Sequence, residues 1–280
     1  MFLIVLTFLM TGCAQKKDQL VTIKTDYGDM IAILYDETPK HKENFLKLVR
    51  EHYYDSLLFH RVIEGFMIQG GDPDSKHAEK NARLGNGGPG YTIDAEINPK
   101  FFHERGALSA ARLGDAMNPS KASSGSQFYI VQGRKLAEAQ LKIDQQKYGN
   151  ALQQFFQKPE NKAYYDSINY FFRHRDEKGY ESYISSLKPI VEEQLGISVE
   201  KEISPELLKA YTTVGGTPQL DGAYTVFGKV IKGLDVIDKI AALPKDQFDR
   251  PVDDVRMTIR VEEMPRKKIE KLYGYTYPDN

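Results

Sequence analysis

The pattern of apolar and polar positions changes character twice along the chain. In residues 20–132 apolar residues occur in short runs separated by glycines, and Val21, Ile23 and Thr25 alternate with polar residues before the turn sequence at 26–29 (DYGD). This period of two predicts a β-hairpin over residues 20–35. From residue 134 to 213 glycines are few and apolar residues recur at helical spacing, and after residue 214 the glycine-rich, strand-like texture returns. The pattern therefore predicts short strands interrupted by a helical segment.

Two amphipathic helices are expected within the strand-rich parts. Thr38-Pro39 is typical of a helix start, with Phe45 and Leu48 following at helical spacing, and residues 233–242 form the second pattern. The helical segment should contain several short helices, because five helix-breaking residues divide it: Pro159, Gly179, Pro189, Gly196 and Pro205.

The strand-like pieces after residue 214 are too few to form a stable domain alone. A β-barrel with a helical insertion therefore explains the chain better than two tandem domains. We expect the barrel in residues 20–132 and 214–262, the insertion in 133–213, and a basic-polar C-terminal tail in 263–280.

The N-terminus has a pattern of its own. Met1–Met10 is apolar at nine of ten positions, which is too short for a membrane span of about 20 residues and indicates the core of a secretory signal in residues 1–12. The only cysteine follows in LMTGC, which resembles a bacterial lipoprotein cleavage box. The resemblance implies that Cys13 carries lipid, that residues 14–19 form a tether, and that the protein is anchored in the bacterial cell envelope, facing the periplasm or associated with the outer membrane. A buried or incidental cysteine is the alternative.

Composition narrows the function classes. Lys and Arg number 38 and Asp and Glu 39, so the net charge of −1 supplies no overall field for a nucleic-acid backbone. One cysteine permits neither an internal disulfide nor a cysteine-rich zinc site. A hydrophobic fraction of 41% with 28% charged residues is ordinary for a folded globular chain.

Familiar chemical motifs are missing or out of context. Residues 85–90 (GNGGPG) match the GxGxxG pattern, but a proline and a β-like run follow where a dinucleotide site needs a helix. The six histidines have no paired metal-ligand spacing, and no GxSxG or Cys/His pair suggests a nucleophile. The remaining choices are a binding module or an enzyme that breaks no covalent bond, and neither requires a cofactor.

Residues 59–72 (FHRVIEGFMIQGGD) closely resemble the signature of the cyclophilin peptidyl-prolyl isomerases. Four further pieces resemble this family in the same order: GALSAA at 106–111, SGSQFYI at 124–130, LDG at 220–222 and VFGKV at 226–230. The resemblance covers residues 20–132 and 214–262. It implies a mainly β fold, a closed eight-stranded antiparallel barrel with two capping helices.

The same resemblance implies an isomerase acting on proline-containing polypeptides, with Arg61 as the donor that stabilises the twisted X–Pro bond. Gln69 would hold Arg61 and a substrate carbonyl. The other expected substrate-binding residues are Phe66, Met67, Tyr129 and Leu220 in the proline pocket, Gln127 on the substrate backbone, Ala111 and Arg112 through their main chains, and Tyr224 at the rim.

Several positions depart from the family pattern. Tyr129 stands where Phe is common and so adds a hydroxyl that needs a partner. Arg112 replaces a usual Asn, and Gln219 replaces a frequent aromatic, which predicts weak cyclosporin binding. The insertion joins two site-bearing segments, so we expect it beside the substrate groove. Its aromatic residues form either a small helical core or an exposed partner-binding surface. A peptide-binding or chaperone module with a degenerate site, or a structural lipoprotein, are the alternative functions.

Overall fold

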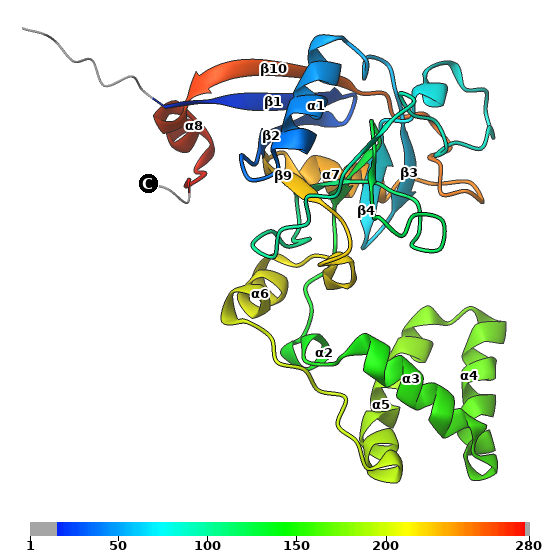
Figure 1. Ribbon diagram of the computed structural model, residues 1–280. Helices are drawn as coiled ribbons and strands as arrows, with labels where there is room; N and C mark the ends of the chain where they lie inside the picture. The colour runs from blue at the N-terminus through cyan, green and yellow to red at the C-terminus, as the bar shows by residue number, and fades with distance from the viewer. Residues whose placement is uncertain (1–15, 278–280) are drawn as a thin grey trace, which may run out of the picture. The chain divides into compact units, whose positions relative to one another are not determined.

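The computed structural model describes residues 16–277, so the expected signal segment and Cys13 lie outside the described part. The chain divides into two compact units, shown in Figure 1. The sheet unit contains the described residues up to Arg134 and from Val214 onward. The helical unit runs from Lys135 to Thr213 rather than from the expected residue 133.

The described part of the sheet unit contains ten strands and three α-helices. Its strands are β1 (Lys17–Thr25), β2 (Gly28–Leu34), β3 (Phe59–Ile63), β4 (Met67–Gly70), β5 (Thr92–Ile93), β6 (Ala107–Ala110), β7 (Ser123–Ser124), β8 (Phe128–Val131), β9 (Val226–Lys232) and β10 (Thr258–Pro265), and its helices are α1 (Pro39–Arg50), α7 (Leu234–Ala241) and α8 (Arg266–Tyr273). Short 3₁₀ turns lie at Pro73–His77 and Pro218–Leu220. Residues 17–19 of the expected tether belong to β1, which begins at Lys17.

Eight strands form one antiparallel sheet in the order β10-β1-β2-β9-β6-β8-β4-β3. The expectation of a closed barrel is wrong, because the sheet is strongly curled but open between β3 and β10. Beside the two edges, Leu58 and Arg256 form an isolated bridge, and Met257 N–H donates to the Leu57 carbonyl. Residues of the segment that leads into β10 pair with the free edge of β3: Phe59 N–H donates to the Val255 carbonyl and Val62 N–H to the Asp249 carbonyl.

The inner face of the curled sheet encloses the main hydrophobic core. Alternate residues of each strand point inward, as Ile68 and Ile130 do, and they meet Phe45 of α1 and Ile237 of α7 in one cluster. Helix α1 packs against β10, and α7 packs against β2, β3 and β4. Both expected helices are present and contribute their apolar faces to this core.

The opposite face of β1, β2 and β10 is covered by α8. Met30, Ala32 and Leu34 of β2 face the main core, while Ile31 and Ile33 pack with Ile269 of α8 in a second cluster. This double burial explains the unbroken apolar run of β2. The C-terminal segment is therefore not a polar tail from residue 263, because β10 continues to Pro265 and α8 follows at once.

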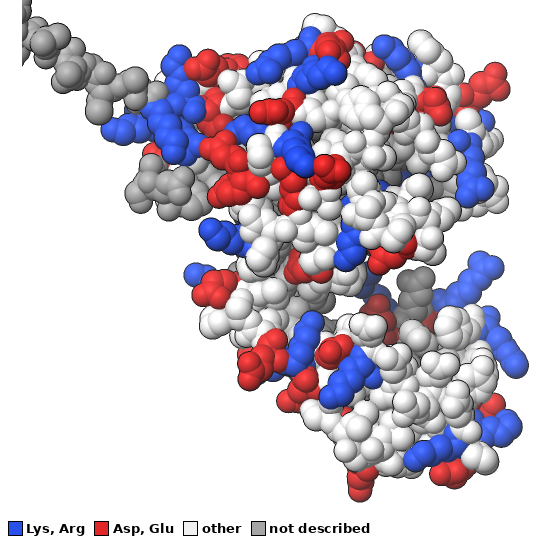
Figure 2. Space-filling model, in the orientation of Figure 1, with Lys and Arg blue, Asp and Glu red and all other residues white. Residues whose placement is uncertain are grey.

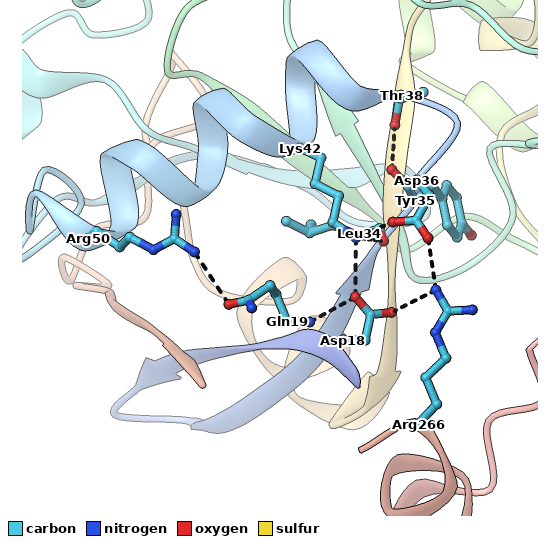
Figure 3. Close-up of polar contacts among 9 residues, drawn as sticks. All are labelled: Asp18, Gln19, Leu34, Tyr35, Asp36, Thr38, Lys42, Arg50 and Arg266. Carbon is cyan, nitrogen blue, oxygen red and sulfur yellow. Dashed lines mark hydrogen bonds and ion pairs between the residues drawn. The ribbon is translucent and has the colours of Figure 1, made fainter. Parts of the chain in front are cut away.

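Charged side chains of both signs are interspersed on the visible face of the molecule (Figure 2). Most pairs are exposed and contribute little stability, but one group joins β1, α1 and α8 (Figure 3). The side chains of Asp18, Lys42 and Arg266 are at most 14% exposed, whereas that of Asp36 is 61% exposed. Lys42 Nζ lies 3.2 Å from Asp18 Oδ1 and 2.6 Å from Asp36 Oδ1, and Arg266 Nη2 lies 2.8 Å from Asp36 Oδ2. The side chain of Asp18 is only 5% exposed, so its charge depends on these partners.

The helical unit consists of α2 (Glu138–Leu141), α3 (Gln145–Gln157), α4 (Lys162–His174), α5 (Glu177–Leu195) and α6 (Pro205–Lys209). Gly179 and Pro189 do not break the segment as expected, because both lie within α5, whose Leu187 and Val191 are buried in the unit's core. Aromatic residues take both expected places: Phe155 is buried, while Tyr170 and Phe172 of α4 are 58% and 65% exposed. In the part of the chain that the structure describes, no helix combines the length and apolarity needed to cross a membrane.

The two ends of the sheet unit at the insertion point are paired with each other. Arg134 and Gly216 exchange backbone hydrogen bonds of 3.3 and 3.0 Å, as neighbouring residues of antiparallel strands do. We therefore expect that replacing residues 135–213 by a short Gly/Ser linker leaves the sheet unit folded. Circular dichroism and thermal melting check this, and a shortened chain without a cooperative transition would contradict it.

Candidate active site

A row of side chains crosses four strands on the outer face of the sheet. In the strand register Arg61 of β3 faces Gln69 of β4, Gln69 faces Tyr129 of β8, and Tyr129 faces Ser109 of β6. Their sequence neighbours Ile68 and Ile130 point into the main core. Because side chains alternate between faces, the same alternation that builds the core places this polar row outside it.

A bulge decides which way Arg61 points. The register of β3 against β4 shifts between Phe59 and Arg61. Phe59 and Val62 both reach the main core although they are three residues apart, and regular alternation would have placed Arg61 on the same face as Phe59. The extra residue in β3 switches the face to which the following side chains point, so the Arg61 side chain points outward. Gly65 then makes the turn into β4 with a φ of +76°, a region that favours glycine.

One cavity of about 120 Å³ collects nine of the ten substrate-site residues expected in this unit. Its lining is Arg61, Phe66, Met67, Gln69, Ala111, Arg112, Tyr129, Leu220 and Tyr224. Met67 and Tyr129 form its apolar wall within a small cluster that Phe66, Leu220 and Tyr224 join. The cavity thus offers an apolar recess with a guanidinium at its edge.

The Arg61 side chain is 41% exposed and is held on two sides. Its Nη1 donates to Gln69 Oε1 at 3.5 Å, and its Nε lies 3.6 Å from Asp249 Oδ2. The adjacent His60 is buried, and burial lowers its pKa to about 4. His60 is therefore neutral at pH 7, and Arg61 supplies the positive charge at this edge.

Gln127 is the expected site residue that does not line the cavity. Its Oε1 accepts from Gln69 Nε2 at 3.1 Å, and its Nε2 donates to the Gly87 carbonyl at 2.8 Å. The amide links Gln69 to the loop at 85–90. This arrangement supports Gln69, while the expected contact of Gln127 with substrate backbone stays a prediction.

The main chain of Ala111 is also engaged within the protein. Its N–H donates to the Gln127 carbonyl at 3.0 Å, and its carbonyl accepts from Ser124 N–H at 2.8 Å. Both main-chain polar groups of Ala111, which were expected to contact the substrate, are thus hydrogen-bonded within the protein.

The Arg112 guanidinium contacts three groups at the rim of the cavity. Its Nε donates to the Ala223 carbonyl at 2.9 Å, its Nη1 lies 2.7 Å from Asp115 Oδ1, and its guanidinium lies over the Tyr224 ring at 4.3 Å. The Arg112 side chain is only 3% exposed. This contact places the Tyr224 ring beside the recess.

His103 and Asp221 were not identified from the sequence as site residues. His103 Nε2 lies 3.0 Å from the Tyr129 hydroxyl, and His103 Nδ1 lies 2.9 Å from Asp221 Oδ1. This pair is the partner that the additional hydroxyl of Tyr129 requires. Burial raises the pKa of that hydroxyl well above its usual value, so Tyr129 is neutral. Asp221 lies in the LDG motif, but its partner is 118 residues away, so no local pattern reveals the pair.

A second histidine group resembles a hydrolytic triad in geometry only. His41 Nε2 lies 2.9 Å from Ser123 Oγ, and His41 Nδ1 lies 2.7 Å from Glu96 Oε2. Ser123 is 1% exposed and His41 2%, so a substrate cannot reach the hydroxyl. Among residues 16–277, no three His, Cys, Asp or Glu side chains are arranged to hold a metal ion. The described cavity combines the apolar side chains of Met67 and Leu220 with the hydrogen-bonding groups of Arg61 and Gln69.

Known proteins of similar sequence match most of this chain. The family model described as "Cyclophilin type peptidyl-prolyl cis-trans isomerase/CLD" matches residues 20–156 and 209–261. A Staphylococcus epidermidis protein named "Putative peptidyl-prolyl cis-trans isomerase" is 32% identical over 254 residues, which cover 89% of this chain and 94% of that protein.

Two further matches extend the comparison. A Streptococcus pyogenes protein named "Putative bifunctional phosphatase/peptidyl-prolyl cis-trans isomerase" is 32% identical over 241 residues, and the match covers 84% of this chain but only 37% of that longer protein. A crystal structure of a Cryptosporidium parvum cyclophilin type peptidyl-prolyl cis-trans isomerase shares the fold, with a TM-score of 0.50 at 23% identity over 89% of this chain and 100% of that one. Because the family match includes the strands that carry the row and the cavity, the chain belongs to the cyclophilin type peptidyl-prolyl cis-trans isomerase family.

Proposed function

We propose that the protein accelerates rotation about X–Pro peptide bonds, with Arg61 as the group that stabilises the twisted transition state. The observation that carries the proposal is the position of Arg61 at the edge of an apolar recess lined by Met67, Tyr129 and Leu220. A proline ring has no donor and fits such a recess, while the bond that must rotate then lies beside the guanidinium.

The physical chemistry of the amide explains how one donor accelerates this rotation. Resonance gives the C–N bond its barrier of about 18–20 kcal/mol. In the twisted transition state the resonance is lost and the proline nitrogen regains a lone pair. A donor directed at that lone pair binds the twisted state better than either planar state, and this difference lowers the barrier. Gln69 and Asp249 hold the Arg61 guanidinium before substrate arrives, which limits its reorganisation during rotation.

An isomerisation assay on a proline peptide tests the proposal. The chain should begin no later than residue 14, because the Lys16 carbonyl accepts a hydrogen bond from Arg266 N–H. We expect exchange well above the uncatalysed rate, whose time scale is tens to hundreds of seconds. A protein that binds the peptide and leaves the rate at the uncatalysed value would be a peptide-binding module instead.

We propose further that the protein is a lipoprotein that acts on exported polypeptides. This rests on the apolar segment Met1–Met10 and on Cys13, which follows it. Lipid on a single cysteine adds buried acyl carbons and hence membrane affinity.

Cys13→Ser should therefore move the protein from the membrane fraction to the soluble fraction of the cell envelope. Immunoblotting of the fractions measures this, and Thr25→Ser, a conservative change within the folded unit, is the matched control. The same distribution for Cys13→Ser and the unaltered protein would remove the lipid anchor from the proposal.

A further inference from the structure

His103 connects the two walls of the proposed proline recess. Its backbone N–H and its Nδ1 both lie 2.9 Å from Asp221 Oδ1, and its carbonyl accepts from Thr217 N–H at 2.9 Å. Its Nε2 lies 3.0 Å from the Tyr129 hydroxyl. All four polar groups of this one buried residue therefore join β8 to the segment at 217–221, which carries Leu220.

The chemistry of these partners fixes the direction of the hydrogen bonds. An Asp221 carboxylate oxygen can only accept, so His103 Nδ1 carries a hydrogen. In the tautomer that carries its hydrogen on Nδ1, Nε2 is the acceptor and the Tyr129 hydroxyl donates to it. The Tyr129 ring and the His103 imidazole lie nearly parallel, with ring centroids 6.1 Å apart and planes 14° apart. The polar hydrogen of Tyr129 is thereby directed at His103, and the ring remains as an apolar surface for the recess.

We propose that His103 is a positioning residue of the active site: through Asp221 it binds the Tyr129 hydroxyl and makes this tyrosine serve as an apolar wall for the proline ring. The inference deepens the proposed function and rests on it. It assigns Tyr129, His103 and Asp221 to one hydrogen-bonded unit behind the cavity. Loss of the acceptor would leave a buried hydroxyl without its partner, and either water would enter the wall or the ring would move.

The test uses a variant that removes one of the two hydrogen-bonding nitrogens of the imidazole, the acceptor Nε2. The amide nitrogen of an asparagine can take the place of Nδ1, so His103→Asn retains a donor for Asp221 and removes the acceptor for Tyr129. We expect kcat/KM for an Ala-Ala-Pro-Phe peptide to fall about tenfold, mainly through KM, since an orphaned buried group weakens binding by such a factor. Adding Tyr129→Phe to His103→Asn removes the orphaned hydroxyl and should recover about threefold or more of that loss.

Two further variants complete the test. Tyr129→Phe alone closes the double-mutant cycle, which measures the coupling between the two side chains. His103→Gln can place an amide oxygen near the former Nε2, so it should exceed His103→Asn in kcat/KM. Thermal melting verifies that each variant is folded, and a role confined to fold stability would change the melting temperature but leave kcat/KM of the folded variants unchanged.

The outcomes separate this inference from the proposed function. The cycle is read on kcat/KM and also on the dissociation constant of the same peptide. An unaltered protein without isomerase activity would refute the proposed function. Full activity of the unaltered protein with independent effects of the two substitutions, and no advantage of His103→Gln, would overturn the role of His103.

Discussion

Replacing Arg61 by alanine should lower kcat/KM for X–Pro isomerisation about 100-fold or more, because loss of a transition-state donor typically costs that factor. The apolar recess is formed by other residues, chiefly Met67 and Tyr129, so the variant should still bind proline peptides. The loss should therefore appear mainly in kcat. Comparing isomerisation rates with peptide titrations of the same variant measures both quantities.

Two control variants sharpen this experiment. Arg61→Lys retains the charge but not the planar fork that meets Gln69 and Asp249, so it should recover only a small part of the rate. Arg173→Ala removes an exposed arginine from the helical unit and should leave the rate unchanged. Similar rates for Arg61→Ala and Arg173→Ala would contradict transition-state stabilisation by Arg61.

The largest expected effect on stability lies at Asp18. Asp18→Asn leaves Lys42 and Arg266, whose side chains are 14% and 9% exposed, with less compensating charge. Because Asp36 still pairs with both cations, the expected loss is that of charged hydrogen bonds, about 1.5–3 kcal/mol in the free energy of unfolding. This group links β1 and α1 to α8 (Figure 3), so α8 should lose protection first. Urea denaturation followed by circular dichroism, with hydrogen exchange at α8, measures the change.

A surface ion pair between β1 and β10 is the matched control for Asp18. Lys17 and Glu263 lie 2.9 Å apart, with side chains 56% and 51% exposed. Glu263→Gln should therefore change the free energy of unfolding by about 0.5 kcal/mol or less. If Asp18→Asn were no more destabilising than Glu263→Gln, the buried network would not hold α8 to the sheet.

Local patterns predicted the elements well where one face was buried. The alternation in β1 and the turn at 26–29 indicated the first hairpin, and Thr38-Pro39 indicated the start of α1. The run in β2 predicted a strand but not its covering helix, because continuous burial does not reveal what packs on the second face. The prediction of a polar tail missed α8, since six of the eight residues of this helix are not buried and its packing depends on Ile269.

The site was predicted mostly through family resemblance, and the catalytic role of Arg61 remains a prediction. The resemblance named the residues that the structure brings around one cavity. It did not predict that the Gln127 side chain donates to the Gly87 carbonyl, or that the Arg112 guanidinium lies over the Tyr224 ring. Those contacts depend on which loops approach the strands.

The family, the strand-rich fold and the helical interruption could be predicted from local patterns, because family motifs and hydrophobic periods are local properties of the chain. Three features emerge only when the chain is folded: the sheet stays open between β3 and β10, a bulge turns Arg61 outward, and His103 meets Tyr129 and Asp221. Each of these depends on hydrogen bonds between separate segments of the chain. Such bonds are selected by register and packing when the sheet curls, and no single stretch of the chain encodes them.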